Sequence, residues 1–140
     1  MRLSIRNQFD GEVVDIARGK AMATVKIRLA ERTAITSAIT VEALDDLGLT
    51  VGRPATVLIK STEVAVGVGP IGLVSIRNQI PATVVGVEHG AVMTTVKLSM
   101  EDGRALTAAV TREAAEDLGL ADGDAVTALV KSTDVSVAVP

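Results

Sequence analysis

The sequence predicts a mainly β protein made of two small OB-like β-barrel modules in tandem, each with one short α-helix. Three observations lead to this prediction. The chain aligns with itself at a separation of 71 residues, each half contains short stretches in which apolar and polar residues alternate, and one segment per half has a helical pattern. Five or six short strands and one helix in about 70 residues are typical of a small closed barrel.

The internal repeat sets the domain organisation. Ser4–Gln8 recurs as Ser75–Gln79, and the sequence Lys-Ser-Thr at 60–62 recurs at 131–133. The two copies align without a gap, and a stretch rich in Gly and Pro joins them near residue 70. We therefore predict a first module over residues 1–69 and a second over 72–140.

The strands follow from residue alternation. Strict alternation over 25–29 places Val25, Ile27 and Leu29 on one buried face, and the stretch 34–39 likewise turns Ile35 and Ile39 inward. Three further runs rich in β-branched residues also read as strands. They cover residues 12–16, 56–60 and 64–68.

One segment per module breaks this pattern and predicts a helix. Thr40 is suited to cap the N-terminus, Glu42 is acidic in the first turn, and Gly48 follows the last helical residue. The second copy of this segment runs from Thr111 to Gly119.

Composition excludes several classes of function. The 140 residues include one Phe and neither Tyr nor Trp, so bases have no rings on which to stack, and the net charge of −3 offers no basic footprint for nucleic acid or an anionic membrane. With no Cys and a single His, no arrangement of acid, base or nucleophile can be assembled, so we predict that the protein is not an enzyme. The N-terminus is polar and the longest apolar runs are strand-sized, which favours a cytoplasmic protein.

Two repeated stretches are dense in hydrogen-bond donors. Ser-Ile-Arg-Asn-Gln opens each module and Lys-Ser-Thr lies near its end, and neither contains a carboxylate. Such a donor set suits a small oxyanion, which only accepts hydrogen bonds. The alternative is structural, because Ser, Asn and Lys are ordinary residues at turns and sheet edges. Glu63 and Asp134 follow the two Lys-Ser-Thr stretches and weaken the anion-site interpretation unless strand alternation turns them away.

We predict structural roles for the remaining polar and sulfur-containing residues. His89 reads as a solvated turn residue, and Met22 and Met93 read as filling the core. The acidic residues of the predicted helices read as a solvated face. These are Asp45, Asp46, Glu116 and Asp117.

Taken together, the ordered motifs resemble a known family. Each module opens with Ser-x-Arg-Asn, continues through Gly-x-x-Met-x-x-Val, ends its helix with Leu-Gly-Leu, and closes with Lys-Ser-Thr and an acidic residue. This pattern resembles the Mop domain of molybdenum-pterin-binding proteins, the molbindins. The match spans nearly the whole chain twice, so the chain is similar to the tandem, di-Mop form.

The resemblance implies oxyanion sites between modules, where the Ser-x-Arg-Asn stretch of one module faces the Lys-Ser stretch of another. The implied ligands are Ser4, Arg6, Asn7, Lys60 and Ser61 in the first half, and Ser75, Arg77, Asn78, Lys131 and Ser132 in the second. The resemblance also implies second-type oxyanion sites near three-fold axes. Their residues are Gly19, Lys20, Ala21 and Met22 in the first half, and Gly90, Ala91, Val92 and Met93 in the second, and the two halves differ at the middle positions.

The function implied by the resemblance is binding, storage and homeostasis of molybdate inside the cell. The implied assembly is a homotrimer of six modules, with a small oxyanion as its partner and neither nucleic acid nor membrane. Molybdate carries no proton at neutral pH, so a donor-only pocket should reject phosphate, whereas tungstate matches molybdate in size and charge and is a second candidate ligand. The alternative function is a regulatory or assembly module that docks a protein partner in molybdenum metabolism.

Overall fold

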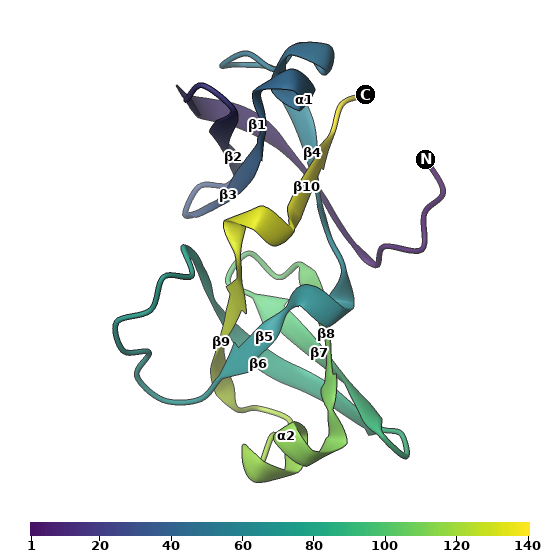
Figure 1. Ribbon diagram of the computed structural model, residues 1–140. Helices are drawn as coiled ribbons and strands as arrows, with labels where there is room; N and C mark the ends of the chain where they lie inside the picture. The colour runs from purple at the N-terminus through teal and green to yellow at the C-terminus, as the bar shows by residue number, and fades with distance from the viewer. The chain divides into compact units, whose positions relative to one another are not determined.

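Two five-stranded antiparallel sheets, each accompanied by one short helix, make up most of the chain and confirm the predicted fold class. The computed structural model describes residues 1–140 (Figure 1). In the first half the elements are β1 (Asn7–Arg18), β2 (Met22–Ala30), β3 (Thr33–Thr40), α1 (Val41–Asp46), β4 (Pro54–Ile59), the 3-10 turn η1 (Ser61–Glu63) and β5 (Ala65–Gly67). In the second half they are β6 (Asn78–His89), β7 (Met93–Met100), β8 (Ala105–Thr111), α2 (Arg112–Asp117), β9 (Ala125–Val130), the 3-10 turn η2 (Ser132–Asp134) and β10 (Val135–Ala138).

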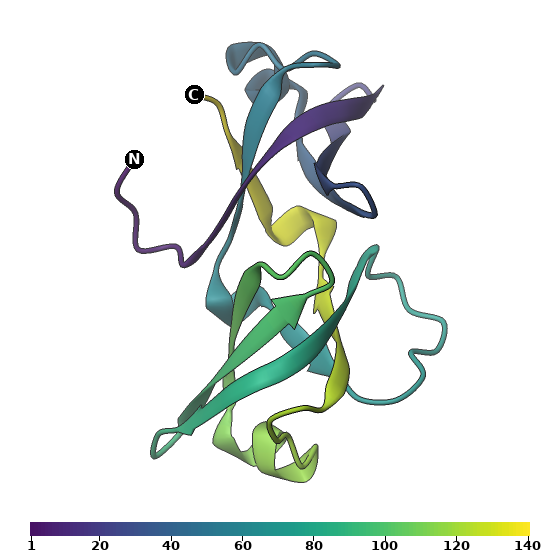
Figure 2. The same ribbon diagram turned by 180° about the vertical axis from the view of Figure 1, so that it is seen from behind.

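The last strand of each sequence copy pairs in the sheet of the other copy. The strand orders are β10-β4-β1-β2-β3 and β5-β9-β6-β7-β8, so β10 lies beside β4 and β5 lies beside β9 (Figures 1 and 2). The chain accordingly divides into two compact units. Unit 1 comprises Met1–Ile59 with Lys131–Pro140, and unit 2 comprises Lys60–Val130. The two sequence copies, 1–69 and 72–140, therefore do not coincide with the structural units.

The predicted alternation places most of the expected side chains in the core of unit 1. Val25 and Ile27 are fully buried and Ile35 is nearly so, and burying each such side chain contributes about 1.5–3 kcal/mol. Leu29 and Ile39 are only half-buried, because each lies near the end of its strand.

The two helices begin and end as predicted. Thr40 Oγ1 accepts a hydrogen bond from Ala43 N at 3.0 Å. Gly48 adopts a positive φ of 62° and its N–H donates to Asp45 O. This left-handed conformation favours glycine after a helix. The second copy repeats the arrangement from Thr111 to Gly119. Neither helix is long and apolar enough to cross a membrane.

One buried hydroxyl holds the exchanged strand in unit 1. Ser37 is fully buried on β3, and its Oγ donates to the carbonyl oxygen of Val135, the first residue of β10, at 2.6 Å. β3 also contacts η2 and β10, which curls the sheet into a half-barrel. At the matched position in the second copy stands Ala108, which cannot make this bond.

We predict that Ser37→Ala lowers the free energy of unfolding by about 1–2 kcal/mol, because the buried carbonyl of Val135 loses its donor. Urea denaturation measures the change, and amide hydrogen exchange should show faster opening of β10. Ser136→Ala, at an exposed position on β10, is the matched control. Equal unfolding midpoints for the two variants would contradict the assigned role of Ser37.

Candidate functional site

The two Lys-Ser-Thr stretches form the same local structure. Each Lys precedes a one-turn 3-10 helix with nearly identical backbone angles, φ −64° and ψ 139° at Lys60 and φ −63° and ψ 138° at Lys131. The N–H of the residue three positions later donates back to the Lys carbonyl at 2.9 Å in both. We call these segments, residues 60–62 and 131–133, the Lys-Ser-Thr turns. Strand alternation therefore does not turn Glu63 and Asp134 away. Both are half-buried at the ends of the 3-10 turns, so they continue to count against an anion site there.

Each Lys-Ser-Thr turn combines an exposed cation with a buried hydroxyl. The side chains of Lys60 and Lys131 are exposed. By contrast, Oγ of Ser61 and Oγ of Ser132 are buried and have no hydrogen-bond partner. Burying a hydroxyl without a partner costs free energy, and such atoms are uncommon in native proteins. Both copies thus share a buried hydroxyl without a partner at the matched position after a lysine.

The Ser-Ile-Arg-Asn segments, residues 4–7 and 75–78, are held in shape by their own arginines. Arg6 Nε donates to Ser4 O at 3.1 Å, and Nη2 donates to Leu3 O at 2.7 Å. Arg77 makes the matching bonds to Ser75 O and Val74 O at 3.4 and 2.8 Å. Both guanidinium groups thus bond backbone carbonyls of their own segments, whereas the side chains of Ser4 and Ser75 are exposed.

Asn7 and Asn78 are the buried members of these segments, with exposed fractions of 2% and 4%. Asn7 is the first residue of β1 and pairs with Ile59 of β4. Val135, the first residue of β10, pairs with Ile59 from the other side. Since β1 and β10 both run antiparallel to β4, the segments that precede them lie at the same end of the sheet.

The unit boundaries fall between Ile59 and Lys60 and between Val130 and Lys131, and they group the predicted residues across the two sequence halves. Unit 1 contains Ser4, Arg6 and Asn7 together with Lys131 and Ser132. Unit 2 contains the other five predicted residues, Ser75, Arg77, Asn78, Lys60 and Ser61. In unit 2, β6 and β5 likewise start at the Val130 end of β9. Within each unit, donors from one copy thus lie at the same sheet end as the Lys-Ser-Thr turn of the other copy.

The predicted second-type residues form the turns between β1 and β2 and between β6 and β7. Gly19 N donates to Met22 O at 2.9 Å, and Gly90 N donates to Met93 O at 2.7 Å. A Cβ on either glycine would lie within 2.8 Å of that Met oxygen, so a larger residue requires the turn to shift. The turn residues Lys20, Ala21, Ala91 and Val92 are all exposed.

The prediction that Met22 and Met93 fill the core is wrong. Their exposed fractions are 48% and 43%. Each is the first residue of its strand, and the next residue, Ala23 or Thr94, points inward instead. The methionines therefore lie on the outer surface beside the turns. Next to the first turn is a hollow of about 360 Å³, and Ala17, Arg18, Gly19 and Met22 are among the residues that line it.

An ion pair ties α1 to the end of β1, and a second ion pair lies within α2, where the same arginine also donates to Gly90 O of the turn at 3.1 Å; the sequence analysis identified neither. Arg18 binds both carboxylate oxygens of Asp45 at 2.7 and 2.8 Å, and the hydrogen bond from the guanidinium lowers the pKa of Asp45 below its ordinary value. In unit 2, Arg112 bonds Glu116 at 2.8 Å and lowers the pKa of that carboxyl in the same way. Asp45 and Glu116 are exposed, as predicted, but both are paired.

His89 takes the place that Arg18 has in the first copy. It is exposed, it ends β6, and its Nδ1 lies 2.8 Å from the hydroxyl oxygen of Thr94. The structure contains no group of three or more His, Cys, Asp or Glu side chains that could hold a metal ion. The bond between His89 and Thr94 joins the facing ends of β6 and β7.

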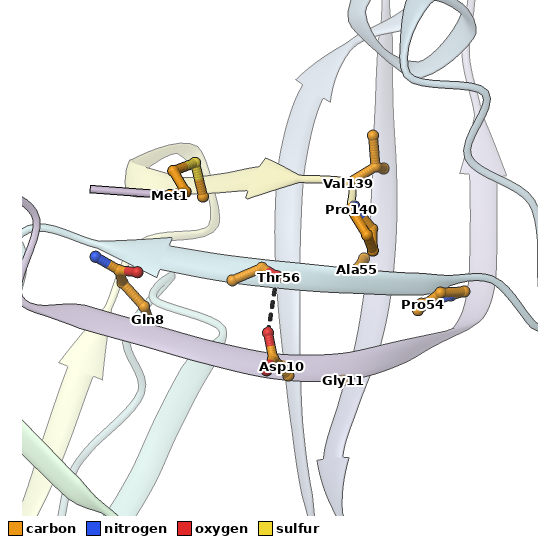
Figure 3. Close-up of a pocket in the computed structure, with 9 residues that line it drawn as sticks. All are labelled: Met1, Gln8, Asp10, Gly11, Pro54, Ala55, Thr56, Val139 and Pro140. Carbon is orange, nitrogen blue, oxygen red and sulfur yellow. Dashed lines mark hydrogen bonds between the residues drawn. The ribbon is translucent and has the colours of Figure 1, made fainter. Parts of the chain in front are cut away.

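Unit 1 also has a hollow that the sequence did not predict. Its volume is about 740 Å³, and strands β1 and β4 and the C-terminal residues line it (Figure 3). Thr56 Oγ1 donates to the Asp10 carboxylate at 2.9 Å inside it. None of the predicted site residues lines this hollow, and the carboxylate of Asp10 would repel an oxyanion.

Known proteins resemble this chain over its full length. The family model of the TOBE domain matches twice, at residues 3–66 and 74–137. The Molybdenum transport protein ModE of Azotobacter vinelandii is 35% identical over 139 residues, which are 99% of this chain and 52% of that protein. The Molybdenum-pterin-binding protein MopB of Rhodobacter capsulatus is 33% identical over 141 residues, covering 100% of this chain and 52% of that protein. The chain thus spans about half the length of these curated relatives.

A solved structure matches the whole chain. It is the cytoplasmic molybdate-binding protein ModG with molybdate bound, at a TM-score of 0.96 and 33% sequence identity, and the match covers 100% of both chains. None of the three names describes an enzyme. These matches confirm the resemblance to tandem Mop proteins that the sequence motifs predicted.

We predict that Arg6→Ala frees residues 1–6 while leaving β1 in place, because the segment loses two hydrogen bonds from the guanidinium. Backbone amide order parameters should fall from about 0.85 to below about 0.6 in this segment. Arg2→Ala, at an exposed position in the same segment, serves as the control. Unchanged order parameters in the Arg6 variant would show that other contacts hold the segment.

Proposed function

We propose that this chain, which belongs to the TOBE domain family, binds molybdate. It carries two copies of the TOBE domain. The binding groups are the Ser-Ile-Arg-Asn segment and the Lys-Ser-Thr turn that lie at the same sheet end in each unit. One observation carries this proposal. The hydroxyls of Ser61 and Ser132 are buried without a partner beside an exposed lysine, and this occurs in both copies.

The chemistry of these groups fits an unprotonated tetrahedral dianion. The lysine ammonium supplies charge and the serine hydroxyl supplies a directed hydrogen bond, and hydrogen bonds to charged groups are the stronger kind. Phosphate at neutral pH is partly protonated, and its own O–H would face further donors. Sulfate is unprotonated, so its rejection depends on the size of the site. Tungstate matches molybdate in size and charge, and we propose that it binds as well.

We further propose that the protein stores and buffers molybdate in the cytoplasm as a homotrimer. The full-length likeness to ModG, named as a cytoplasmic molybdate-binding protein, supports the location and the ligand. Large apolar side chains exposed at the turns support association between chains, because a soluble monomer gains nothing from presenting them to water. They are Met22, Val92 and Met93. Second-type oxyanion sites at these turns, formed by residues 19–22 and 90–93, are part of the same proposal.

One observation favours the alternative function, a regulatory or assembly module that docks a protein partner. In ModE and MopB the matched region is about half of a longer protein. A chain that failed to bind molybdate and still associated with a protein of molybdenum metabolism would favour this alternative.

We predict that purified full-length protein binds molybdate saturably, with at least two molybdate ions per chain from the two sets of donors. Isothermal titration calorimetry measures the stoichiometry, and tungstate should compete while a tenfold excess of phosphate should not. Absence of saturation at micromolar molybdate would overturn the proposed function.

We predict that Ser61→Ala and Ser132→Ala each weaken one site by about tenfold or more, because a hydrogen bond to a charged group contributes about 1.5–3 kcal/mol. The fold should tolerate both changes, since each removes a buried hydroxyl that has no partner in the protein. Thr62→Ala and Thr133→Ala are matched controls at exposed neighbouring positions. If the serine and threonine variants bind equally well, the hydroxyls are not ligands.

A further inference from the structure

Gln8 and Gln79 directly follow the Ser-Ile-Arg-Asn segments, and neither is among the predicted site residues. Gln8 Nε2 donates to Ile5 O at 2.9 Å, and Gln79 Nε2 donates to Ile76 O at 3.1 Å. Both glutamines are exposed, so water could satisfy their amides and burial does not require these bonds. The same bond in both copies therefore indicates that the glutamine shapes the segment before it.

Together with the arginine, the glutamine holds three consecutive carbonyl groups. The carbonyl oxygens of residues 3–5 all accept hydrogen bonds, two from Arg6 and the third from Gln8. The carbonyl oxygens of residues 74–76 are held in the same way by the matching side chains of the second copy. We call this arrangement, three carbonyls bound by one arginine and one glutamine, the carbonyl clamp.

The carbonyl clamp also sets the direction of three backbone N–H groups. No peptide bond of the chain is cis, and in a planar trans peptide the N–H points opposite to the carbonyl of the preceding residue. The carbonyls of residues 3–5 face the clamping side chains, so the N–H groups of residues 4–6 point away from them. None of these N–H groups donates to another backbone group, and the same is true of residues 75–77.

Successive backbone N–H groups that point the same way form a concavity that binds anions. Backbone N–H groups only donate, so they suit an oxyanion that carries no proton. The carbonyl clamp holds the segment in this conformation before the anion arrives, which lowers the ordering cost of binding. The guanidinium, by contrast, already uses two of its N–H groups on carbonyls in each copy.

We infer that Gln8 and Gln79 are positioning residues for the oxyanion, and that the backbone N–H groups of residues 4–6 and 75–77 contact it. In each copy the glutamine directs the last of the three N–H groups and the arginine directs the first two. Neither glutamine touches the anion. The inference rests on the proposed function, and it makes Arg6 and Arg77 part of the carbonyl clamp instead of side-chain ligands.

The first test is calorimetric titration of the full chain and of the double variant Gln8→Met, Gln79→Met with molybdate. Methionine is close to glutamine in size and has no N–H to donate. The double variant should bind about tenfold more weakly, which corresponds to about 1.4 kcal/mol, because the anion must then order about one residue of backbone per site. Unchanged affinity would overturn the inference. Absence of binding by the unsubstituted chain would instead overturn the proposed function.

Nuclear magnetic resonance distinguishes positioning from a merely structural role of the glutamines. When molybdate is added, the backbone amide proton signals of residues 4–6 and 75–77 should move downfield. In Gln8→Met the Arg6 amide signal should lose most of this shift while the Arg77 signal keeps it, and Gln79→Met should give the reverse. Each copy is thus the control for the other. An Arg6 amide shift that persists in Gln8→Met would contradict the positioning role.

The side-chain Nε–H signals of the two arginines give a further measurement. We expect them to stay in place when molybdate binds, because each Nε–H remains bonded to a carbonyl of its own segment. If the Nε–H signals moved and the backbone amide signals did not, the guanidinium would be the ligand and the inference would be wrong.

Discussion

The exchange of the final strands is the constraint on which the rest of this structure depends. β10 completes the sheet of unit 1 because its register against β4 puts Val135 beside Ile59, and Ser37 then fixes the entry of that strand with a buried hydrogen bond. The same pairing delivers Lys131 and Ser132 to the sheet end where Ser4, Arg6 and Asn7 begin β1. One set of backbone pairings therefore both closes the core and brings these segments to one end of the sheet. A change that loosens β10 should disturb both together, since the Lys-Ser-Thr turn and the strand are consecutive in the chain.

Much of the fold could be predicted because local sequence determines it. Alternation identified the buried positions of Val25 and Ile27, and the Thr40 cap and Gly48 stop are decided within a few residues of the helix. The exchange could not be predicted in the same way. The strands that follow the two Lys-Ser-Thr turns have similar sequences, so each fits against β4 or β9 by pattern alone. The alternation of residues 34–39 places Ser37 on the inner face, but its hydrogen-bond partner could not be predicted, because the acceptor lies 98 residues away in the sequence.

In the candidate site, too, the sequence identified which residue types are present but not what each side chain does. The motifs identified donor-rich segments, but Arg6 directs its guanidinium to carbonyls of its own segment, and the buried donor is the hydroxyl of Ser61 or Ser132. Which donor is exposed and which is buried depends on a 3-10 turn at the end of a strand, and alternation does not describe that conformation. Met22 was misassigned because the turn before β2 determines which residues of the strand face inward, and a shift of one position exchanges the inner and outer faces.

Duplication within one chain allows the two copies of an exposed residue to differ. In an assembly of identical subunits, every copy must carry the same residue. The residues of the Lys-Ser-Thr turns cannot diverge freely. Each turn leads into a strand that pairs in the sheet of the other copy, so a substitution in one copy alters the packing of the other. Exposed residues have no such restriction. Arg18 can become His89 with little cost, since Arg112 takes over the pairing with the helix acid in unit 2. Divergence between the two copies therefore accumulates at exposed positions, where Arg18, Lys20 and Arg28 are matched by His89, Ala91 and Ser99.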